Sequence, residues 1–391
     1  MMASSMWGAR WGARSQDMRF LVFDARPTIF HHSCTNPMPH LARSLRRWWL
    51  LLLPVIALAS CRTVSFYTQA ARGQWEISHK ARPISVILGN SQTDPKLRKK
   101  LELVQELRAF AAKELHLPAA EQYDCYCDLG RKFAVWVVFA APEFSVEGKT
   151  WWYPLVGSLK YRGYFSAEEA EREVSRLKAN GYDVYAGGVD AYSTLGWFRD
   201  PVLNTFLRRD DAELAELLFH ELTHQRLYIS GDTDFNEAFA TAAGQEGARR
   251  WLRSMGRTAA LKEYEINLGL EREFIQLVQQ TRSRLERLFA ETGHTPDEMR
   301  ALKQAEFARL RQEAEALKKK TGGSLPVDRW FSKPVNNARL NTLATYYDLV
   351  PGFERMLRAE GGDLEKFLKR VDAMKSMSDA ARRKAVMSGG S

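Results

Sequence analysis

Two histidines four residues apart are the feature of this sequence that points most directly to chemistry. The string His-Glu-Leu-Thr-His covers residues 220–224, and on a helix residues four apart lie one turn apart on the same face. Both imidazoles can then reach one metal ion, and Glu221 lies beside that ion, where it can act as a general base. Two histidines on a helix can also serve packing alone, so the interpretation depends on the flanking elements.

The flanks of this motif predict a helix followed closely by a second one. Asp210 and Glu213 form a pair that can cap the first turn, and leucines at helical spacing give an apolar stripe. We expect the first helix to end at Gly231 and Asp232. A tight Gly-Asp-Thr-Asp turn would then fold the second helix, which begins near Asn236, back against the first.

A catalytic zinc ion takes three protein ligands and keeps a fourth position for water. The third ligand must come from downstream of the motif or from elsewhere in the fold, and Glu237, in the first turn of the second helix, is the next candidate. We therefore predict one zinc ion per chain, bound by His220, His224 and Glu237. Glu221 would take the proton of the attacking water and pass it to the leaving amine.

These residues carry a resemblance to the gluzincin metallopeptidases, whose signature is HExxH followed by a second helix with a glutamate ligand. The Asn-Glu-Ala-Phe-Ala string at 236–240 resembles the Asn-Glu-Gly-Phe-Ala string of gluzincin aminopeptidases, although the linker, residues 225–236, is shorter than theirs. From about residue 62 to about residue 360 the chain is similar to bacterial lipoproteins described as predicted aminopeptidases. The resemblance implies a peptide substrate and a gluzincin-like zinc peptidase core.

The resemblance also implies where substrate would bind. In gluzincins a strand upstream of the motif forms the edge of the cleft, and the substrate peptide adds to it as a further strand. Residues 191–198 match that position, although an ordinary core strand fits them as well. The gluzincin aminopeptidases carry a glutamate there that binds the α-amine, whereas this strand has only Asp190 before it, so aminopeptidase and endopeptidase action both stay open. The predicted substrate-binding residues are Ala191, Tyr192, Ser193 and Thr194.

A donor for the oxyanion of the tetrahedral intermediate is also required. In gluzincins a tyrosine or histidine of the C-terminal helical part often supplies it, which makes Tyr346 and Tyr347 the candidates by position. Tyr161 and Tyr164, in an upstream turn, are rivals, and the spacing does not select among the four.

The N-terminal part has the pattern of a bacterial lipoprotein signal. Basic residues precede a short apolar run, 48–57, and then Leu-Ala-Ser-Cys matches a lipobox ending at Cys61. The run is too short for a stable membrane-spanning helix, whereas a signal peptide is removed and leaves Cys61 as the lipid-bearing first residue. Met38 is the expected true start. Arg62 is not the aspartate that retains lipoproteins in the inner membrane, so we expect the outer membrane, facing the periplasm.

Composition excludes little else. The net charge is +10 over 391 residues, but no nucleic-acid-binding motif accompanies it, so we predict a solvated basic surface and no nucleic-acid partner.

Cys125 and Cys127 are expected to be free or unusually paired, because a bridge between residues two apart is strained. Members of the lipoprotein family often carry a cysteine pair where this chain has Trp152 and Ser158, so that bridge is absent here.

The sequence thus predicts an α+β, mostly helical protein with a small sheet and a long antiparallel helical hairpin. The predicted order is an upstream segment and signal peptide (1–60), a catalytic core (61–257), the hairpin (258–325), a C-terminal helical part that completes the core (326–378) and a disordered tail (379–391). Within 182–198 we expect two strands separated by a Gly-Gly break.

Three functions fit the sequence. The first is a membrane-anchored zinc peptidase, and the second is a binding or chaperone-like envelope lipoprotein whose site has decayed. The third is a structural lipoprotein that uses the hairpin to hold envelope partners. The intact HExxH motif argues against the second, since decay usually removes the glutamate of the motif, Glu221.

Overall fold

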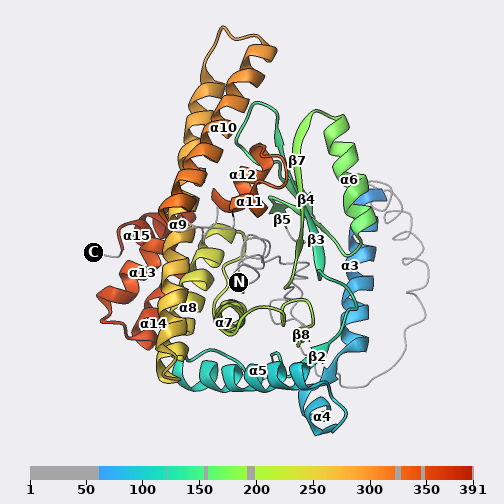
Figure 1. Ribbon diagram of the computed structural model, residues 1–391, viewed down its shortest axis with the longest axis vertical. Helices are drawn as coiled ribbons and strands as arrows, with labels where there is room; N and C mark the ends of the chain where they lie inside the picture. Colours follow the sequence, from blue (N-terminus) through green and yellow to red (C-terminus); the bar gives the residue numbers. More distant parts are fainter. Residues whose placement is uncertain are drawn as a thin grey trace, which may run out of the picture.

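The protein is α+β and mostly helical, as the sequence predicts (Figure 1). The computed structural model describes residues 61–120, 122–153, 157–191, 199–321, 327–344 and 348–389. The helices are α3 (Cys61–Lys80), α4 (Ile84–Gly89), α5 (Pro95–Glu114), α6 (Ala167–Ala179), α7 (Asp211–Arg226), α8 (Thr233–Ser254), α9 (Thr258–Ala290), α10 (Pro296–Lys320), α11 (Val327–Trp330), α12 (Asn337–Ala344), α13 (Val350–Ala359), α14 (Leu364–Ala373) and α15 (Asp379–Met387). The strands are β1 (Arg82–Pro83), β2 (Cys125–Cys127), β3 (Val135–Pro142), β4 (Trp151–Tyr153), β5 (Gly157–Leu159), β6 (Arg162–Tyr164), β7 (Tyr182–Val189) and β8 (Val202–Leu203).

The predicted signal peptide lies outside the described residues. The helix α3 begins at Cys61. Within the described ranges, none of the helices combines the length and the apolar character needed to cross a membrane.

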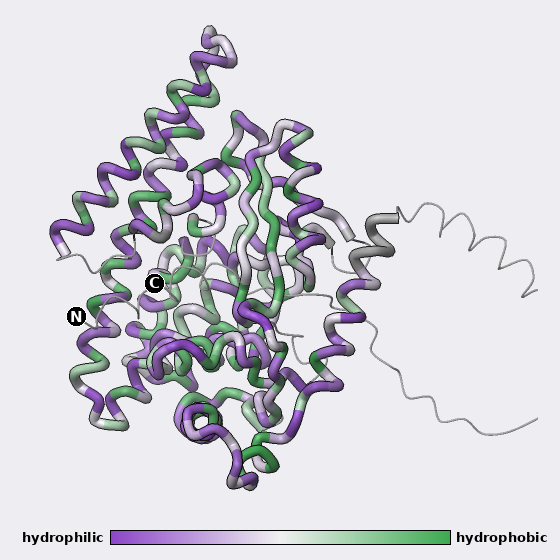
Figure 2. Tube along the Cα trace, turned by 45° about the vertical axis from the view of Figure 1, so that its right-hand side comes forward, coloured by the Kyte–Doolittle hydropathy of each residue, from purple (hydrophilic) through white to green (hydrophobic). Residues whose placement is uncertain are grey.

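The main sheet has the strand order β6-β3-β7, and β3 runs antiparallel to both neighbours. The apolar, β-branched run of β3 is buried almost throughout, as expected for a central strand. Helices α6 and α12 both pack against β3 and β7, and Figure 1 shows them on opposite sides of these strands. Figure 2 shows long hydrophobic stretches in the central strands.

The predicted Gly-Gly break does not interrupt β7. Gly187 and Gly188 lie inside the strand, opposite Val137 and Trp136 of β3. A Cβ atom built at Gly188 would lie 2.2 Å from the ring of Phe133, so the glycine makes room for an aromatic side chain while the backbone stays extended. The predicted second strand, 191–198, falls outside the described residues except for Ala191.

The helical hairpin is present, and the local signals that predict it are confirmed. Thr295 accepts a hydrogen bond from the Glu298 N–H and the Glu298 side chain accepts from the Thr295 N–H, which is a capping box, with Pro296 at the first helical position. Apolar residues of α9 and α10, joined by residues of α11 and α12, form a core that is separate from the main one and includes Phe274, Leu310 and Trp330. The hairpin therefore extends from the body of the protein with its own apolar seam (Figure 1).

Residues 379–387 form the helix α15, whereas the sequence predicts a disordered tail from residue 379. Ser378 caps helix α15, and Arg382 is buried and donates to Asp232 at 2.9 Å. Gly352 of α13 lies so close to α15 that a Cβ atom there would come within 2.2 Å of the Val386 carbonyl oxygen. The ion pair of the buried Arg382 with the partly exposed Asp232 and the buried Val386 hold this helix, and neither produces an apolar stripe that a sequence pattern would reveal.

The cysteines of β2 are free thiols. Burial raises the pKa of the Cys127 thiol to about 11, and burial also raises the pKa of Cys125, so neither thiol has the lowered pKa of a reactive cysteine. Trp152 and Ser158 face each other across β4 and β5. This register places together the two positions at which the family resemblance implies a cysteine pair.

Candidate metal centre

The helix α7 is capped as predicted, but it ends earlier. The Asp210 side chain accepts a hydrogen bond of 2.8 Å from the Glu213 N–H. The helix stops at Arg226, and Leu227 is already extended, whereas the sequence predicts an end at Gly231. The cause lies downstream, because the Asn236 side chain accepts from the Ile229 N–H at 2.9 Å and donates to the Ile229 carbonyl oxygen at 2.7 Å.

The helix α8 begins where α7 was expected to end. Asp232 accepts a hydrogen bond from the Phe235 N–H and is the N-cap of α8. Gly231 supplies the turn with a positive φ of 85°, a conformation that favours glycine. The buried Arg382 of α15 also donates a hydrogen bond to the Asp232 carboxylate. The C-terminal helix therefore fixes the start of the helix that carries Glu237.

A glycine allows α7 and α8 to lie directly against each other at the site. A Cβ atom at Gly244 would lie 2.8 Å from the Glu216 carbonyl oxygen and 3.1 Å from the His220 Cβ. One turn further along α8, Gly247 faces the ring of Phe219 in the same way. The close approach brings the histidine-bearing face of α7 up to the backbone of α8.

Three candidate ligand atoms converge between the two helices. The Nε2 atoms of His220 and His224 are 3.0 Å apart, and Glu237 Oε2 is 3.4 Å from the first and 3.6 Å from the second. The three residues are buried, with exposed fractions of 6%, 3% and 4% respectively. Among the described residues they form the one group of His, Cys, Asp and Glu side chains arranged to hold a metal ion.

The donor set fits zinc. Zinc bound tetrahedrally at about 2.0–2.1 Å would hold its ligand atoms roughly 3.3 Å apart, and the three separations of 3.0, 3.4 and 3.6 Å scatter around that value. Two imidazoles and one carboxylate are a ligand set of catalytic zinc sites, which keep one position open. Glu221 is buried in the same turn of α7 but lies outside the ligand group, which is the placement expected of a base rather than a ligand.

The structure does not place every predicted site residue. Tyr346 and Tyr347, the predicted oxyanion donors, lie outside the described residues, as do Tyr192, Ser193 and Thr194 of the predicted substrate strand. Ala191 is buried directly after β7.

The two rival tyrosines are also buried. The Tyr161 ring packs against Phe139, with ring centroids 5.6 Å apart. Tyr164 lies in β6, and the Arg162 guanidinium sits 5.8 Å from its ring centroid. Both tyrosines therefore belong to the packing of the sheet, and the choice among the four candidates stays open.

Two residues that shape the site carry weak sequence signals. Asn236 fixes the linker between the helices, yet it stands in the sequence only as the neighbour of a predicted ligand. Gly244 lies in a run of small residues, Ala-Thr-Ala-Ala-Gly at 240–244, which is the one local indication of a close helix contact. Small residues on a helix face let two backbones approach, but the partner helix cannot be read from that run.

The arrangement defines a class first: a buried His-His-Glu group of the HExxH type that could hold a metal ion, built on two packed helices. A family model described as "Putative aminopeptidase" matches residues 65–387, most of the chain, and the protein belongs to that family. The match includes α7 and α8 and also α15. No curated protein and no solved structure gives a match to the chain.

Proposed function

We propose that this protein is a zinc-dependent peptidase that hydrolyses peptide bonds and acts as an aminopeptidase. The observation that carries the proposal is the convergence of His220, His224 and Glu237 within a buried contact of two helices. Burying two imidazoles and a carboxylate costs stability unless they are paired or bind a metal, so their meeting at ligand distances favours a metal-dependent activity. Membership of the aminopeptidase family supports a peptide substrate.

In the proposed reaction the metal ion polarises the reacting groups, and Glu221 transfers the proton. Zinc, when bound, supplies a Lewis acid that polarises the scissile carbonyl and lowers the pKa of a water molecule. His220, His224 and Glu237 hold it in place. Glu221 accepts the proton that the attacking water loses and delivers it to the nitrogen of the leaving amine. The carbonyl oxygen becomes an oxyanion, for which a tyrosine is the proposed donor.

The second part of the proposal is a lipid anchor at Cys61, which places the enzyme at the outer membrane, facing the periplasm. The basic residues, the short apolar run and the Leu-Ala-Ser-Cys string support it. Mass spectrometry of the mature N-terminus tests it, together with a Cys61→Ser variant. We expect an acylated Cys61 and loss of membrane partitioning in the variant, and an unmodified N-terminus upstream of Cys61 would reject the anchor.

The alternative is a non-catalytic envelope lipoprotein that acts as a binding or chaperone-like module. Such a protein has no need of Glu221 beside an assembled ligand set, so the intact site favours the enzyme. The Glu221→Gln variant separates the two functions, because the substitution keeps size and hydrogen bonding but removes the base.

For that test, purified wild type and Glu221→Gln are compared for zinc content and for cleavage of a mixed peptide library read by mass spectrometry. We expect equal zinc and a loss of hydrolysis of at least about 10²–10⁴-fold, the usual contribution of general-base catalysis. Products that lack one N-terminal residue support aminopeptidase action, and internal cuts support an endopeptidase. Equal behaviour of the two proteins across the library would reject the peptidase.

A further inference from the structure

A pocket of about 280 Å³ lies between helices α8, α9, α13 and α14, which Figure 1 shows close together along one side of the molecule. Four arginines and three glutamates line it, together with buried apolar side chains such as Phe353. We call it the arginine pocket, after Arg249, Arg253, Arg272 and Arg358.

The arginine pocket and the candidate metal centre lie on different faces of α8. Glu237 and Gly244, seven residues apart, face α7, whereas Ala242, Arg249 and Arg253 line the pocket. With 3.6 residues per turn, Ala242 and Gly244 point to nearly opposite sides of the helix. The pocket is therefore a site separate from the metal centre.

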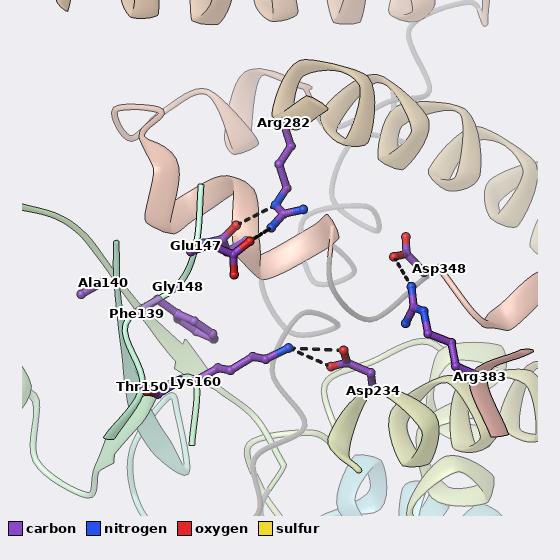
Figure 3. A pocket seen from close by; sticks show the side chains of 11 residues that line it. Phe139, Ala140, Glu147, Gly148, Thr150, Lys160, Asp234, Arg282, Asp348 and Arg383 are labelled. Atoms are coloured by element: carbon purple, nitrogen blue, oxygen red, sulfur yellow. Dashed lines mark hydrogen bonds and ion pairs between the residues drawn. The ribbon is translucent and has the colours of Figure 1, made fainter. Parts of the chain in front are cut away.

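A second charged pocket, of about 220 Å³, differs in its charge balance (Figure 3). Each of its cations has a carboxylate partner. The pairs are Lys160 with Asp234, Arg282 with Glu147, and Arg383 with Asp348. These charges compensate each other, so that pocket has no preference for a ligand of either sign.

In the arginine pocket, two of the three glutamates are neutralised by hydrogen-bonded arginines. Glu246 accepts a hydrogen bond of 2.9 Å from Arg250. Glu354 accepts a hydrogen bond from Arg272. Neither carboxylate is then left over to neutralise the remaining arginines of the pocket.

Those remaining arginines, Arg249, Arg253 and Arg358, have N–H groups that a ligand can use. Arg249 lies 3.6 Å from Glu246, and this separation is too long for a hydrogen bond. The same holds for Arg253, which lies 3.7 Å from Glu265. Within the described ranges, Arg358 has no carboxylate at ion-pair distance, and none of the three guanidinium groups donates a hydrogen bond to the protein. Each guanidinium carries five N–H donors.

The helical spacing brings these three arginines together. Arg249 and Arg253 are four residues apart on α8, where side chains at this spacing are neighbours. Arg249 also lies 3.8 Å from Glu354, which precedes Arg358 by one turn of α13. Three guanidinium groups thus face one pocket with Glu265 as the remaining counter-charge, which leaves a surplus of two positive charges.

We propose that the arginine pocket binds a phosphate group, either as inorganic phosphate or as part of a larger molecule. A phosphate monoester carries about 1.5–2 negative charges at pH 7, which matches the surplus of two positive charges. Guanidinium groups bind phosphate oxygens through paired N–H donors. The pair of Arg253 with Glu265 is half-exposed, at 52% and 49%, so a phosphate can replace the glutamate at small cost. This binding does not require the proposed peptidase activity.

Calorimetric titration of inorganic phosphate into the zinc-loaded full chain tests the site. We expect one saturable site whose affinity falls by about 10–100-fold in Arg249→Met and in Arg358→Met, as for the loss of hydrogen bonds to a charged group. Arg287→Met removes an exposed arginine further along α9 and should leave the affinity unchanged. Phosphate that binds the zinc ion instead would be insensitive to all three substitutions.

Two further variants distinguish a phosphate site from an ion-pair network that only stabilises the fold. Glu265→Gln should strengthen phosphate binding because it releases Arg253, whereas Arg253→Met should weaken it. Arg358→Lys keeps the charge but loses the paired donors, so its affinity should lie between those of the parent and Arg358→Met. Thermal unfolding in phosphate-free buffer checks that each variant is folded.

A vesicle experiment identifies the source of the phosphate. The Cys61→Ser chain, which lacks the proposed lipid, is sedimented with phosphatidylcholine vesicles that contain or lack phosphatidic acid, a phosphate monoester. Arginine-dependent binding in the calorimeter supports a soluble phosphate compound, and arginine-dependent binding to the phosphatidic acid vesicles alone supports a lipid head group. Absence of binding in both experiments, or binding that Arg249→Met and Arg358→Met do not change, would overturn the phosphate site.

Discussion

The helix pair α7–α8 and the hairpin α9–α10 are built on opposite plans. Each consists of two consecutive helices joined by a short linker, but α7 is buried on all sides from Glu213 to His224, whereas α9 and α10 bury one face and expose the other. Figure 2 shows polar and apolar residues alternating along the hairpin. The buried polar residues of α7–α8 are Glu213, Glu216, His220, Glu221, Thr223, His224, Asn236, Glu237 and Gln245.

The two helix pairs therefore bury different kinds of side chain: the hairpin buries side chains that stabilise the fold, and α7–α8 buries side chains that can bind a metal ion. The hairpin buries apolar side chains against each other and places ion pairs near the surface, such as those of Arg284 with Glu306 and Glu313, although Glu271 and Lys303 are buried. The α7–α8 pair takes ionisable groups into the main core, where they cost stability unless they are paired or ligate a metal. A surrounding apolar core of sheet, α5, α13 and α14 residues compensates for that cost.

The largest expected effect is on metal binding, and it should be confined to α7–α8. Replacing Glu237 by alanine removes one of three ligands, so zinc affinity should fall by more than about 100-fold, since the loss of groups that merely orient ligands already costs 10–100-fold. Glu313→Ala, which removes a paired surface carboxylate of the hairpin, should leave zinc binding unchanged. Elemental analysis and chelator competition measure both. Full zinc in Glu237→Ala would show that the third ligand lies elsewhere.

Two glycine-to-alanine substitutions, one in α8 and one in α9, should change the free energy of unfolding in opposite directions. At Gly244 the new methyl group meets the Glu216 carbonyl oxygen at 2.8 Å, so we expect overpacking of about 1–3 kcal/mol, partly offset by about 1 kcal/mol of helix propensity. At Gly269, in α9, nothing lies within 4 Å of the added atom, and alanine should stabilise by about 0.5–1 kcal/mol. Urea unfolding of both variants should therefore give opposite signs.

If both variants change the free energy of unfolding in the same direction, the close contact between α7 and α8 would be contradicted. Stabilisation by Gly244→Ala would mean that α7 and α8 do not touch at the ligand turn. Zinc content of the same variant gives an independent reading, because a displaced α7 backbone moves His220 away from Glu237.

The parts of the site that the sequence predicts are those encoded within one or two helical turns. The spacing of His220 and His224, the cap at Asp210 and the order of motif and Glu237 all lie within one short stretch, and local spacing determines local geometry. The same holds for the capping box that starts α10. These features are correct in the structure because no distant residue decides them.

Distant contacts decide the features that the sequence does not predict. The end of α7 depends on hydrogen bonding by Asn236, and the order of the C-terminal helix depends on the pairing of Arg382 with Asp232. The requirement for glycine at position 188 depends on the nearby ring of Phe133. Each of these pairs looks ordinary along the chain, because neither residue belongs to a periodic pattern. The pocket lined by Lys160, Asp234, Arg282 and Arg383 follows the same rule, since these side chains come from the turn between β5 and β6, from α8, from the hairpin and from the C-terminal helix.

The smallest expected effect concerns the hairpin alone. Thr295→Ala removes the side-chain acceptor of the capping box at the far end of the hairpin, which should destabilise α10 by about 1 kcal/mol. The first turns of α10 lie in a core separate from that of α7–α8, which α9 joins at its start through Tyr264 and Leu268. Faster hydrogen exchange should therefore appear in the first turns of α10, with zinc content and peptide cleavage unchanged. Thr295→Ser keeps the acceptor and should restore protection. If the alanine variant also lowers zinc content or exposes α7 and α8 to exchange, the two helix pairs are coupled, and the division between a folding unit and a chemical unit would be wrong.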